Sequence, residues 1–335
     1  MKTTPARFSL GIDITDTALN MVLLSGTPKN PRREKAEHVV LGEGFVVEGI
    51  VQKPEEVAAL ILRSVSMFLG EKDIELRVLV SVPDREVFPH LVHVASQGSM
   101  VQWKQEALRK AFAAIPFGQQ ELYADVADLG MAEDRQRMLF FVAARRRIVD
   151  ALLKTVRHTG LVPHVFEMAS VALARKLAPE ALELEKEHTV VLDVGSAFID
   201  VALFWGGGIR FAESFPLPKN GTGNPEMLIM LADHIERAMQ FAAVPFTQLV
   251  VAGEAAGDPA LRQTLENRFP NIRLSTGGER TTDALLAIAE GLALRGLEAD
   301  PVSSGMNLLP SPVQKKNIIW EALVRFFRAR YNKNI

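Results

Sequence analysis

The sequence has 335 residues, of which 48% are hydrophobic and 23% are charged, and it contains no cysteine. This length and composition predict an ordered protein with two or more compact units and argue against long disordered regions. The lack of cysteine excludes disulfides, iron–sulfur clusters and thiolate zinc sites, and it fits a reducing cytoplasm.

Charge is distributed unevenly along the chain. Residues 311–335 carry six basic residues and one acidic residue, so this tail is +5; because the whole chain is −2, the rest is −7. An acidic body argues against nucleic-acid binding, whereas the basic tail favours an anionic partner. The sequence has no apolar run long enough for a membrane-spanning helix and no signal peptide, so we expect a soluble chain.

The first predicted element is a strand, turn and strand over residues 10–24, with Asp13 at the end of the first strand. Residues 27–37 are charged, contain two prolines and predict a loop. Apolar residues at helical spacing predict a helix over residues 53–69, and residues 76–82 predict a strand.

Over residues 83–162 the pattern changes to strand, helix, strand and strand, followed by a further helix. The corresponding segments are residues 86–94, 101–112, 122–129, 138–143 and 148–158. This order predicts a small α/β insert. A helix over residues 167–177 and a charged link then lead to the second half of the chain.

The second half opens with another strand, turn and strand over residues 190–203, in which Asp193 ends the first strand. Alignment of Asp13 with Asp193 suggests a duplicated lobe with a shared cleft. Further elements are predicted as strands over residues 210–216 and 248–252 and as helices over residues 226–241, 259–269 and 281–295.

These hairpins could carry nucleotide chemistry. Their turns can aim backbone N–H groups at phosphate oxygens, and an Asp at a strand end can bind Mg²⁺ directly or through water. Residues 250–257 would add a glycine turn before a helix. A single Asp-Gly hairpin is usually only a surface turn, but the ordered set of three favours a nucleotide cleft.

The order of elements resembles the type IV pilus assembly protein PilM family, which is related to FtsA and to actin-like ATPases. The most specific pieces are Gly-Ile-Asp-Ile, Ser-Val-Pro, Leu-Asp-Val-Gly and the segment from Ala289 to Leu297. The resemblance covers about residues 8–310. It implies an α/β, actin-like (ribonuclease H-like) fold with two lobes and a small inserted strand-helix-strand-strand domain.

The resemblance also implies a division of the chain and a role. The first lobe would comprise residues 1–82 and 163–187, the insert residues 83–162, the second lobe residues 188–300, and the tail residues 301–335. The protein would be a scaffold of a type IV pilus or type II secretion-like assembly platform, cytoplasmic and peripheral to the inner membrane.

By the same resemblance, a retained nucleotide site would hold ATP with Mg²⁺. Its residues would be Asp13, Thr15, Thr17, Asp193, Gly195, Ser196 and Gly253, with Asp13 and Asp193 on the metal. Several positions depart from the family pattern: Asp16, Asn20, Ala197, Phe198 and Glu254.

These departures predict weak or lost ATP binding. An uncompensated carboxylate ~4 Å from a phosphate costs about 4 kcal/mol at an effective dielectric constant of 20, and Asp16 and Glu254 could each bring one. Phe198 adds bulk where the backbone must approach closely. No catalytic residue is assigned, since none stands out as a base that positions an attacking water.

The tail contains two further candidate sites. A basic amphipathic helix is predicted around residues 317–331, and it either packs on its own body or a neighbouring subunit or contacts the membrane. Its candidate contact residues are Trp320, Leu323, Arg325, Phe326, Phe327 and Arg328.

Residues Asn307, Leu308, Leu309 and Pro310 look like the Asn-Leu-Leu-Pro peptide at the start of PilN, the membrane partner that PilM binds through a groove. They are either a partner-like peptide, held in cis or offered to a neighbouring subunit, or a linker whose leucines fill a surface gap.

We therefore expect a non-catalytic or weakly nucleotide-binding scaffold with a membrane partner resembling PilN. The inner membrane surface and a second copy of the chain are further candidate partners, and nucleic acid is not. Two alternatives remain open: an active ATPase of the same fold, and an FtsA-like polymer tethered to the membrane.

Overall fold

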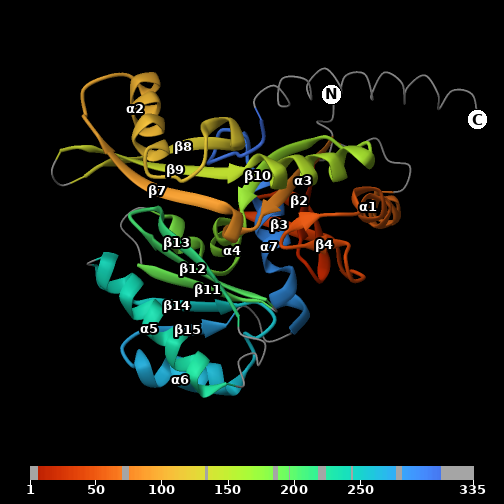
Figure 1. The fold of residues 1–335 in the computed structure, drawn as a ribbon. Coiled ribbons are helices and arrows are strands. Elements are labelled where there is room, and N and C mark those ends of the chain that lie inside the picture. Colours follow the sequence, from red (N-terminus) through yellow and green to blue (C-terminus); the bar gives the residue numbers. More distant parts are fainter. Residues whose placement is uncertain are drawn as a thin grey trace, which may run out of the picture.

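The computed structural model describes residues 7–69, 75–132, 135–183, 188–195, 197–217, 224–242, 244–276 and 281–310. Two five-stranded sheets form two lobes, and a three-stranded sheet with one helix stands beside them (Figure 1). In Figure 1 the three-stranded sheet lies at the top, the first lobe at the right and the second lobe at the bottom.

The sheet of the first lobe has the order β10-β6-β1-β2-β3. Its strands are β1 (Arg7–Ile14), β2 (Ala18–Thr27), β3 (Asn30–Val40), β6 (Glu75–Val82) and β10 (Pro163–Met168). The central strand β1 pairs antiparallel with β2 and parallel with β6, and Asp13 lies opposite Asn20.

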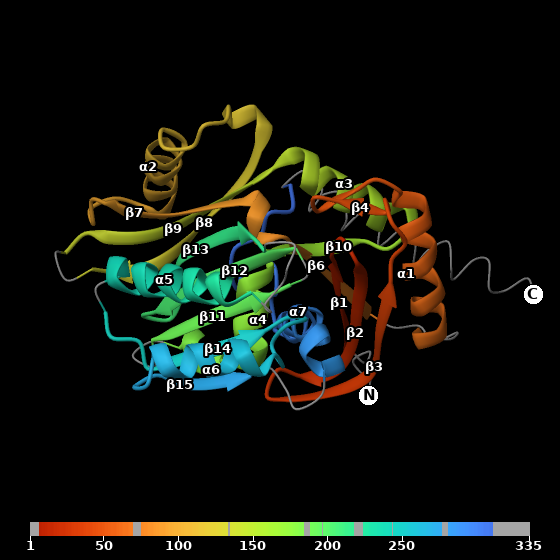
Figure 2. The same ribbon diagram turned by 60° about the horizontal axis from the view of Figure 1, so that its bottom comes forward.

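Alternation along β1 sends successive side chains to opposite faces of this sheet. Leu10 and Ile12 are fully buried in one core with Val57 and Ile61 of helix α1 (Pro54–Leu69). Gly11 faces helix α7 (Thr281–Gly296), where a Cβ atom would lie 1.9 Å from a backbone oxygen. Glycine is therefore required for α7 to approach the sheet, and Figure 2 shows this helix beside β1 and β2.

The second sheet repeats the topology of the first, with the order β13-β12-β11-β14-β15. Its strands are β11 (Thr189–Val194), β12 (Phe198–Trp205), β13 (Gly208–Pro216), β14 (Gln248–Ala252) and β15 (Arg273–Thr276). The central strand β11 again pairs antiparallel with the next strand and parallel with a later one. The predicted duplication is confirmed.

Helices α5 (Pro225–Ala242) and α6 (Pro259–Arg268) pack against one face of this second sheet. Helix α6 begins at Pro259, as the sequence predicts. Asp258 caps it, because its Oδ1 accepts a hydrogen bond of 2.8 Å from the N–H of Ala260. Such an N-cap satisfies one of the N–H groups that have no partner within the helix.

The insert begins with a short helix, η1 (Asp84–Glu86), and its sheet has the order β7-β9-β8. Its strands are β7 (Val87–Val94), β8 (Leu122–Met131) and β9 (Arg137–Arg145), and helix α2 (Met100–Phe112) covers one face. These elements confirm the predicted strand, helix, strand and strand. Short elements complete the fold: β4 (Val46–Val47), β5 (Ile50–Val51), η2 (Gln119–Glu121) and η3 (Pro179–Leu182).

Two helices differ from the division expected from the sequence. Helix α3 (Arg146–His158) packs on α1, and its apolar residues join the core of the first lobe. Helix α7 packs on β1, β2 and helix α4 (Ala169–Leu177) rather than on the second sheet. We therefore propose that α3 and α7 belong to the first lobe. Within the described residues, no helix is both long and apolar enough to cross a membrane.

Two segments differ from the prediction. The loop expected over residues 27–37 is wrong, because most of it belongs to strand β3 at the edge of the first sheet. The charged side chains of β3 suit an edge strand with few buried positions. Residues 163–168 form strand β10 before helix α4, whereas a helix was expected to start near residue 167. Strand β15 was not expected at all.

Candidate functional site

The predicted nucleotide loops meet between the lobes. Thr17, in the turn after β1, donates a hydrogen bond of 3.3 Å from its hydroxyl to Oε1 of Glu254, in the turn after β14. Burial raises the pKa of Asp193, at the end of β11, and the charges of the neighbouring Asp200 and Asp13 raise it further. The structure therefore brings together the three loops that the sequence indicated. Ser196 lies outside the described residues.

Asp13 is only 4% exposed and is held by two side chains. The hydroxyl of Ser81 donates to Oδ1 at 2.6 Å, and the side-chain amide of Asn20 donates to Oδ2 at 3.0 Å. Burial raises the pKa of Asp13, although both hydrogen bonds act in the opposite direction. Asn20, a position where the family pattern often has lysine, thus binds a carboxylate and supplies no positive charge.

Gly253 packs directly against the strand end that carries Asp193. Its φ is +87°, and a Cβ atom would lie 2.3 Å from Oδ1 of Asp193 and 2.5 Å from the backbone oxygen of Val194. Only glycine fits here, because both the backbone conformation and the available space exclude a side chain.

The turns themselves use some of the N–H groups that could face a phosphate. The N–H of Thr15 donates to the backbone oxygen of Ala18 at 2.8 Å, and the N–H of Gly195 donates to that of Phe198 at 3.0 Å. These two donors close their own hairpins. They are not available to an anion in this arrangement.

Arg85 changes the expected effect of two departures from the family pattern. It forms an ion pair of 2.8 Å with Asp16 and lies 4.3 Å over the ring of Phe198. Asp16 also accepts a hydrogen bond of 2.7 Å from the N–H of Gly49. The charge of Asp16 is therefore compensated, and the expectation that it stands unpaired beside a phosphate is not met.

Four carboxyl groups form a carboxyl cluster between the lobes: Asp13 and Asp84, which are buried, and Asp193 and Asp200, which are partly buried. Burial, with the charge of Asp200, raises the pKa of Asp84 to about 8, and burial raises the pKa of Asp200 to about 6. Burial and the neighbouring carboxylates also raise the pKa of Asp193 well above its usual value. Ionising all four carboxyl groups at once is therefore unfavourable.

Metal binding at Asp13 and Asp193 remains a prediction. Among the residues that the structure describes, no group of three or more His, Asp or Glu side chains is arranged to hold a metal ion. Sequence reasoning missed Ser81, Asp84 and Arg85 as parts of this site. The Ser-Val-Pro motif followed by two charged residues was the available signal.

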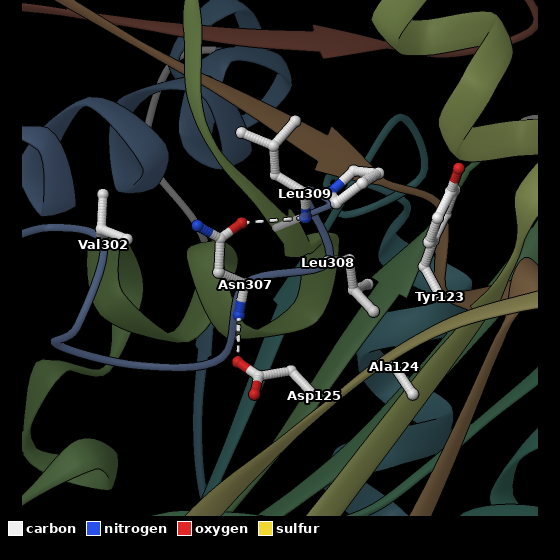
Figure 3. Close-up of a pocket in the computed structure, with 8 residues that line it drawn as sticks. Tyr123, Ala124, Asp125, Val302, Asn307, Leu308 and Leu309 are labelled. Atoms are coloured by element: carbon white, nitrogen blue, oxygen red, sulfur yellow. Dashed lines mark hydrogen bonds between the residues drawn. The ribbon is translucent and has the colours of Figure 1, made fainter. Parts of the chain in front are cut away.

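A second candidate site involves residues 307–310, which line a pocket (Figure 3) and contact both β10 and β8. We call the surface of β10 and β8 that this segment covers the groove. Oδ1 of Asn307 accepts hydrogen bonds of 3.0 Å from the N–H groups of Phe166 and Leu309, and its Nδ2 donates to the backbone oxygen of His164 at 3.0 Å. The N–H of Asn307 donates to Oδ2 of Asp125 at 2.9 Å. One asparagine thus joins strand β10 to strand β8.

The two leucines that follow are buried. Leu308 is 2% exposed and Leu309 is 3% exposed, and both belong to the core of the first lobe. The N–H of Leu308 donates to the backbone oxygen of Phe166 at 2.9 Å, as an added strand would. A cavity of about 200 Å³ lies beside this segment, partly lined by Tyr123 and Val302.

Arg295, near the end of α7, fastens the chain just before this segment. It is fully buried, and its guanidinium donates to Oε1 of Glu167 at 2.6 Å and to the backbone oxygens of Pro301 and Met306 at 2.9 and 2.8 Å. Burial acts to raise the pKa of Glu167, but Arg175 and Arg295 lower it below its usual value. Glu167 is therefore a buried carboxylate held by two arginines.

Glycines in the same motif permit the packing around Arg295. A Cβ atom at Gly291 would lie 1.8 Å from the backbone oxygen of Ala172, and one at Gly296 would lie 1.9 Å from Oγ of Ser9. The motif from Ala289 to Leu297 thus builds the helix that fixes the start of the tail. The residues predicted as membrane contacts, Trp320 to Arg328, lie outside the described residues.

Comparison with solved structures identifies the fold. A structure described as a PilM-PilN type IV pilus biogenesis complex is 22% identical, with 87% of this chain and 98% of that chain covered and a TM-score of 0.69. A Bacteroides thetaiotaomicron protein with an actin-like ATPase fold is 11% identical, with 86% and 95% covered and a TM-score of 0.51. The fold is therefore actin-like, as predicted.

Comparison of the sequence identifies the family. No curated protein matches the chain significantly. The family model of the type IV pilus assembly protein PilM matches residues 11–212, which is more than half of the chain. The chain therefore belongs to the type IV pilus assembly protein PilM family.

Proposed function

We propose that this chain is a cytoplasmic scaffold of the inner-membrane platform of a type IV pilus or type II secretion-like machine, and that it acts through protein contacts without hydrolysing ATP. The observation that carries the proposal is the groove between β10 and β8, which holds Asn307, Leu308 and Leu309 through backbone and side-chain contacts. A groove built for a short peptide suits a protein that assembles other proteins.

The chemistry of the groove suits a membrane partner that resembles PilN. Donors and acceptors at His164, Phe166 and Asp125 match an asparagine side chain and backbone, and the apolar core accepts two leucines. A neighbouring structure is described as a complex of PilM with PilN. The contact would hold the chain at the inner membrane from the cytoplasmic side.

Membrane fractionation tests this attachment. We expect the chain to sediment with inner membranes of its source cells and to move to the soluble fraction when the gene for the PilN-like partner is deleted. Deletion of an unrelated inner-membrane protein is the control. An unchanged distribution after deletion of the partner would contradict attachment through that partner.

Two features of the cleft support weak or absent nucleotide binding. Arg85 is already paired with Asp16, and two hairpin N–H groups are used within their turns. Among the residues that the structure describes, no side chain is identified as a base that positions water, and we expect no meaningful hydrolysis.

Active ATP binding is the second candidate, because Asp13, Asp193 and Gly253 do meet as they would in a nucleotide cleft. Calorimetric titration with Mg-ATP separates the two. Our proposal predicts no binding in the micromolar range. Micromolar binding that disappears in the Asp13→Asn/Asp193→Asn variant would favour the ATPase, since these changes keep the shape of both side chains and remove their charge. An FtsA-like polymer remains a further alternative, and sedimentation at rising protein concentration would reveal it.

A further inference from the structure

We propose that residues 307–310 act as an intramolecular ligand that keeps the groove between β10 and β8 closed to peptides of the same kind from another chain. The inference rests on the proposed function in one respect: it takes the partner's peptide to have the sequence Asn-Leu-Leu-Pro. Its consequence is that a partner peptide must displace this segment before it can bind.

The polar groups of the groove are already paired with the segment. The N–H and the backbone oxygen of Phe166 bind Asn307 and Leu308, the backbone oxygen of His164 binds the amide of Asn307, and Oδ2 of Asp125 binds its N–H. A second peptide could make these contacts only after the first has left. Figure 3 shows the bonds of Asn307 to Leu309 and Asp125.

The apolar part of the groove is filled as well. Leu308 and Leu309 are almost fully buried and pack in the same core as Phe166 of β10. A competing peptide could place its own leucines in these positions only after Leu308 and Leu309 had left them.

The attachment to α7 makes the segment a strong competitor. Arg295 holds the backbone oxygens of Pro301 and Met306, so the segment begins one residue after a fixed point. The intervening chain is ordered by Asp300, whose side chain accepts hydrogen bonds from the N–H groups of Val302 and Ser303. A short tether of this kind gives an effective concentration on the order of millimolar or more.

Peptide binding to the full chain tests the inference. The probe is a fluorescein-labelled peptide with the sequence of residues 305–310, Gly-Met-Asn-Leu-Leu-Pro, and the readout is fluorescence anisotropy. We expect the wild-type chain to bind it at least tenfold more weakly than the Leu308→Ala/Leu309→Ala variant, in which the internal segment has lost its anchors. The same peptide with both leucines replaced by alanine should bind neither protein.

A matched control separates release of the segment from general loss of stability. Leu261, in α6 of the second lobe, is 1% exposed, so Leu261→Ala removes a comparable buried side chain far from the groove. This variant should bind the peptide no better than the wild type. Equal binding by the wild type and the released variant, or no binding by a folded released variant, would overturn the inference.

A second measurement does not depend on how well the released variant folds. Because the chain has no cysteine, Leu309→Cys introduces a single thiol. We expect this thiol to react slowly with a chromogenic disulfide reagent and to react at least tenfold faster when excess unlabelled peptide displaces the segment. A thiol that reacts fast without peptide would contradict cis occupancy. The outcome is independent of whether the chain serves a pilus platform, so it can fail or succeed separately from the proposed function.

Discussion

At the scale of single residues, the cleft is defined by close contacts that leave no room for change. Gly253 is the tightest, because its φ is positive and any Cβ atom would meet Oδ1 of Asp193 at 2.3 Å. The sequence indicated a glycine loop here, but only the structure reveals which atoms require it.

Substitution at this position has a predictable cost. Gly253→Ala should lower the free energy of unfolding by about 2 kcal/mol or more, because it adds backbone strain and a clash with the end of β11. Urea denaturation measures the loss. Gly257→Ala is the matched control, since a Cβ atom there meets nothing within 4 Å and the change should stay within about 0.5 kcal/mol. Similar losses in both variants would contradict the account.

The carboxyl cluster predicts how stability depends on pH. Burial and the charge of Asp200 raise the pKa of Asp84 to about 8, whereas an aspartate in the unfolded chain has a pKa of about 3.9. The folded state therefore binds more protons between these values, and the free energy of unfolding should fall as pH rises from about 4 to 8. Ionisation of Asp84 over this pH range should lower the free energy of unfolding by an amount on the order of 2 to 5 kcal/mol.

The variant Asp84→Asn isolates this contribution. Its side-chain oxygen can still accept the hydrogen bond from the N–H of Ser170, but it cannot ionise. Denaturation between pH 5 and 8 should give a flatter profile for this variant than for the wild type. Asp233→Asn, an exposed change on α5, should leave the slope as it is. An unchanged slope in Asp84→Asn would show that Asp84 is ionised in the folded protein.

At the scale of elements, alternating hydrophobicity was enough to predict both hairpins and most of the insert. Strand β3 was missed because its side chains are mostly polar and exposed, as an edge strand allows, so periodicity gave no signal. Strand β10 was missed because its six residues run directly into α4. Strand β10 forms one side of the groove. Because the sequence did not predict this strand, it indicated a partner-like peptide at residues 307–310 but not the strand that binds it.

Helix α7 carries Arg295, the residue of the Ala289–Leu297 motif that holds the start of the tail. Arg295 is fully buried and donates to Glu167 and to two backbone oxygens, so its removal takes one donor from each of these three groups. Arg295→Met should lower the free energy of unfolding by about 3 kcal/mol, measured by thermal or urea denaturation. Arg262→Met is the control, because its ion pair with Glu266 is exposed on α6 and contributes less than about 0.5 kcal/mol. Equal stability of the two variants would show that Arg295 does not stabilise the chain that follows α7.

At the scale of the whole molecule, one sheet topology occurs twice, and the ends of the two central strands meet at the carboxyl cluster. The sequence predicted this duplication from the two Asp-bearing hairpins. It could not predict that Arg85 would be paired with Asp16, or that α7 would pack on the first lobe, because both depend on contacts between distant segments.

The cleft lies between the two lobes, whereas the groove lies between β10 and β8. The cleft brings the ends of two similar hairpins together with four carboxyl groups. The groove has complete polar and apolar contacts with a peptide of the chain. We therefore propose that the groove serves assembly and that the cleft joins the two lobes.

A complementation experiment in cells that lack the gene for this chain, with surface pili counted, tests whether the cleft needs a nucleotide. We expect the Asp13→Asn/Asp193→Asn variant, produced at the wild-type level, to restore pili as well as the wild-type chain does, because no nucleotide is needed. Restoration by the wild type but not by an equally abundant, folded variant would contradict the claim and make the cleft a working nucleotide site.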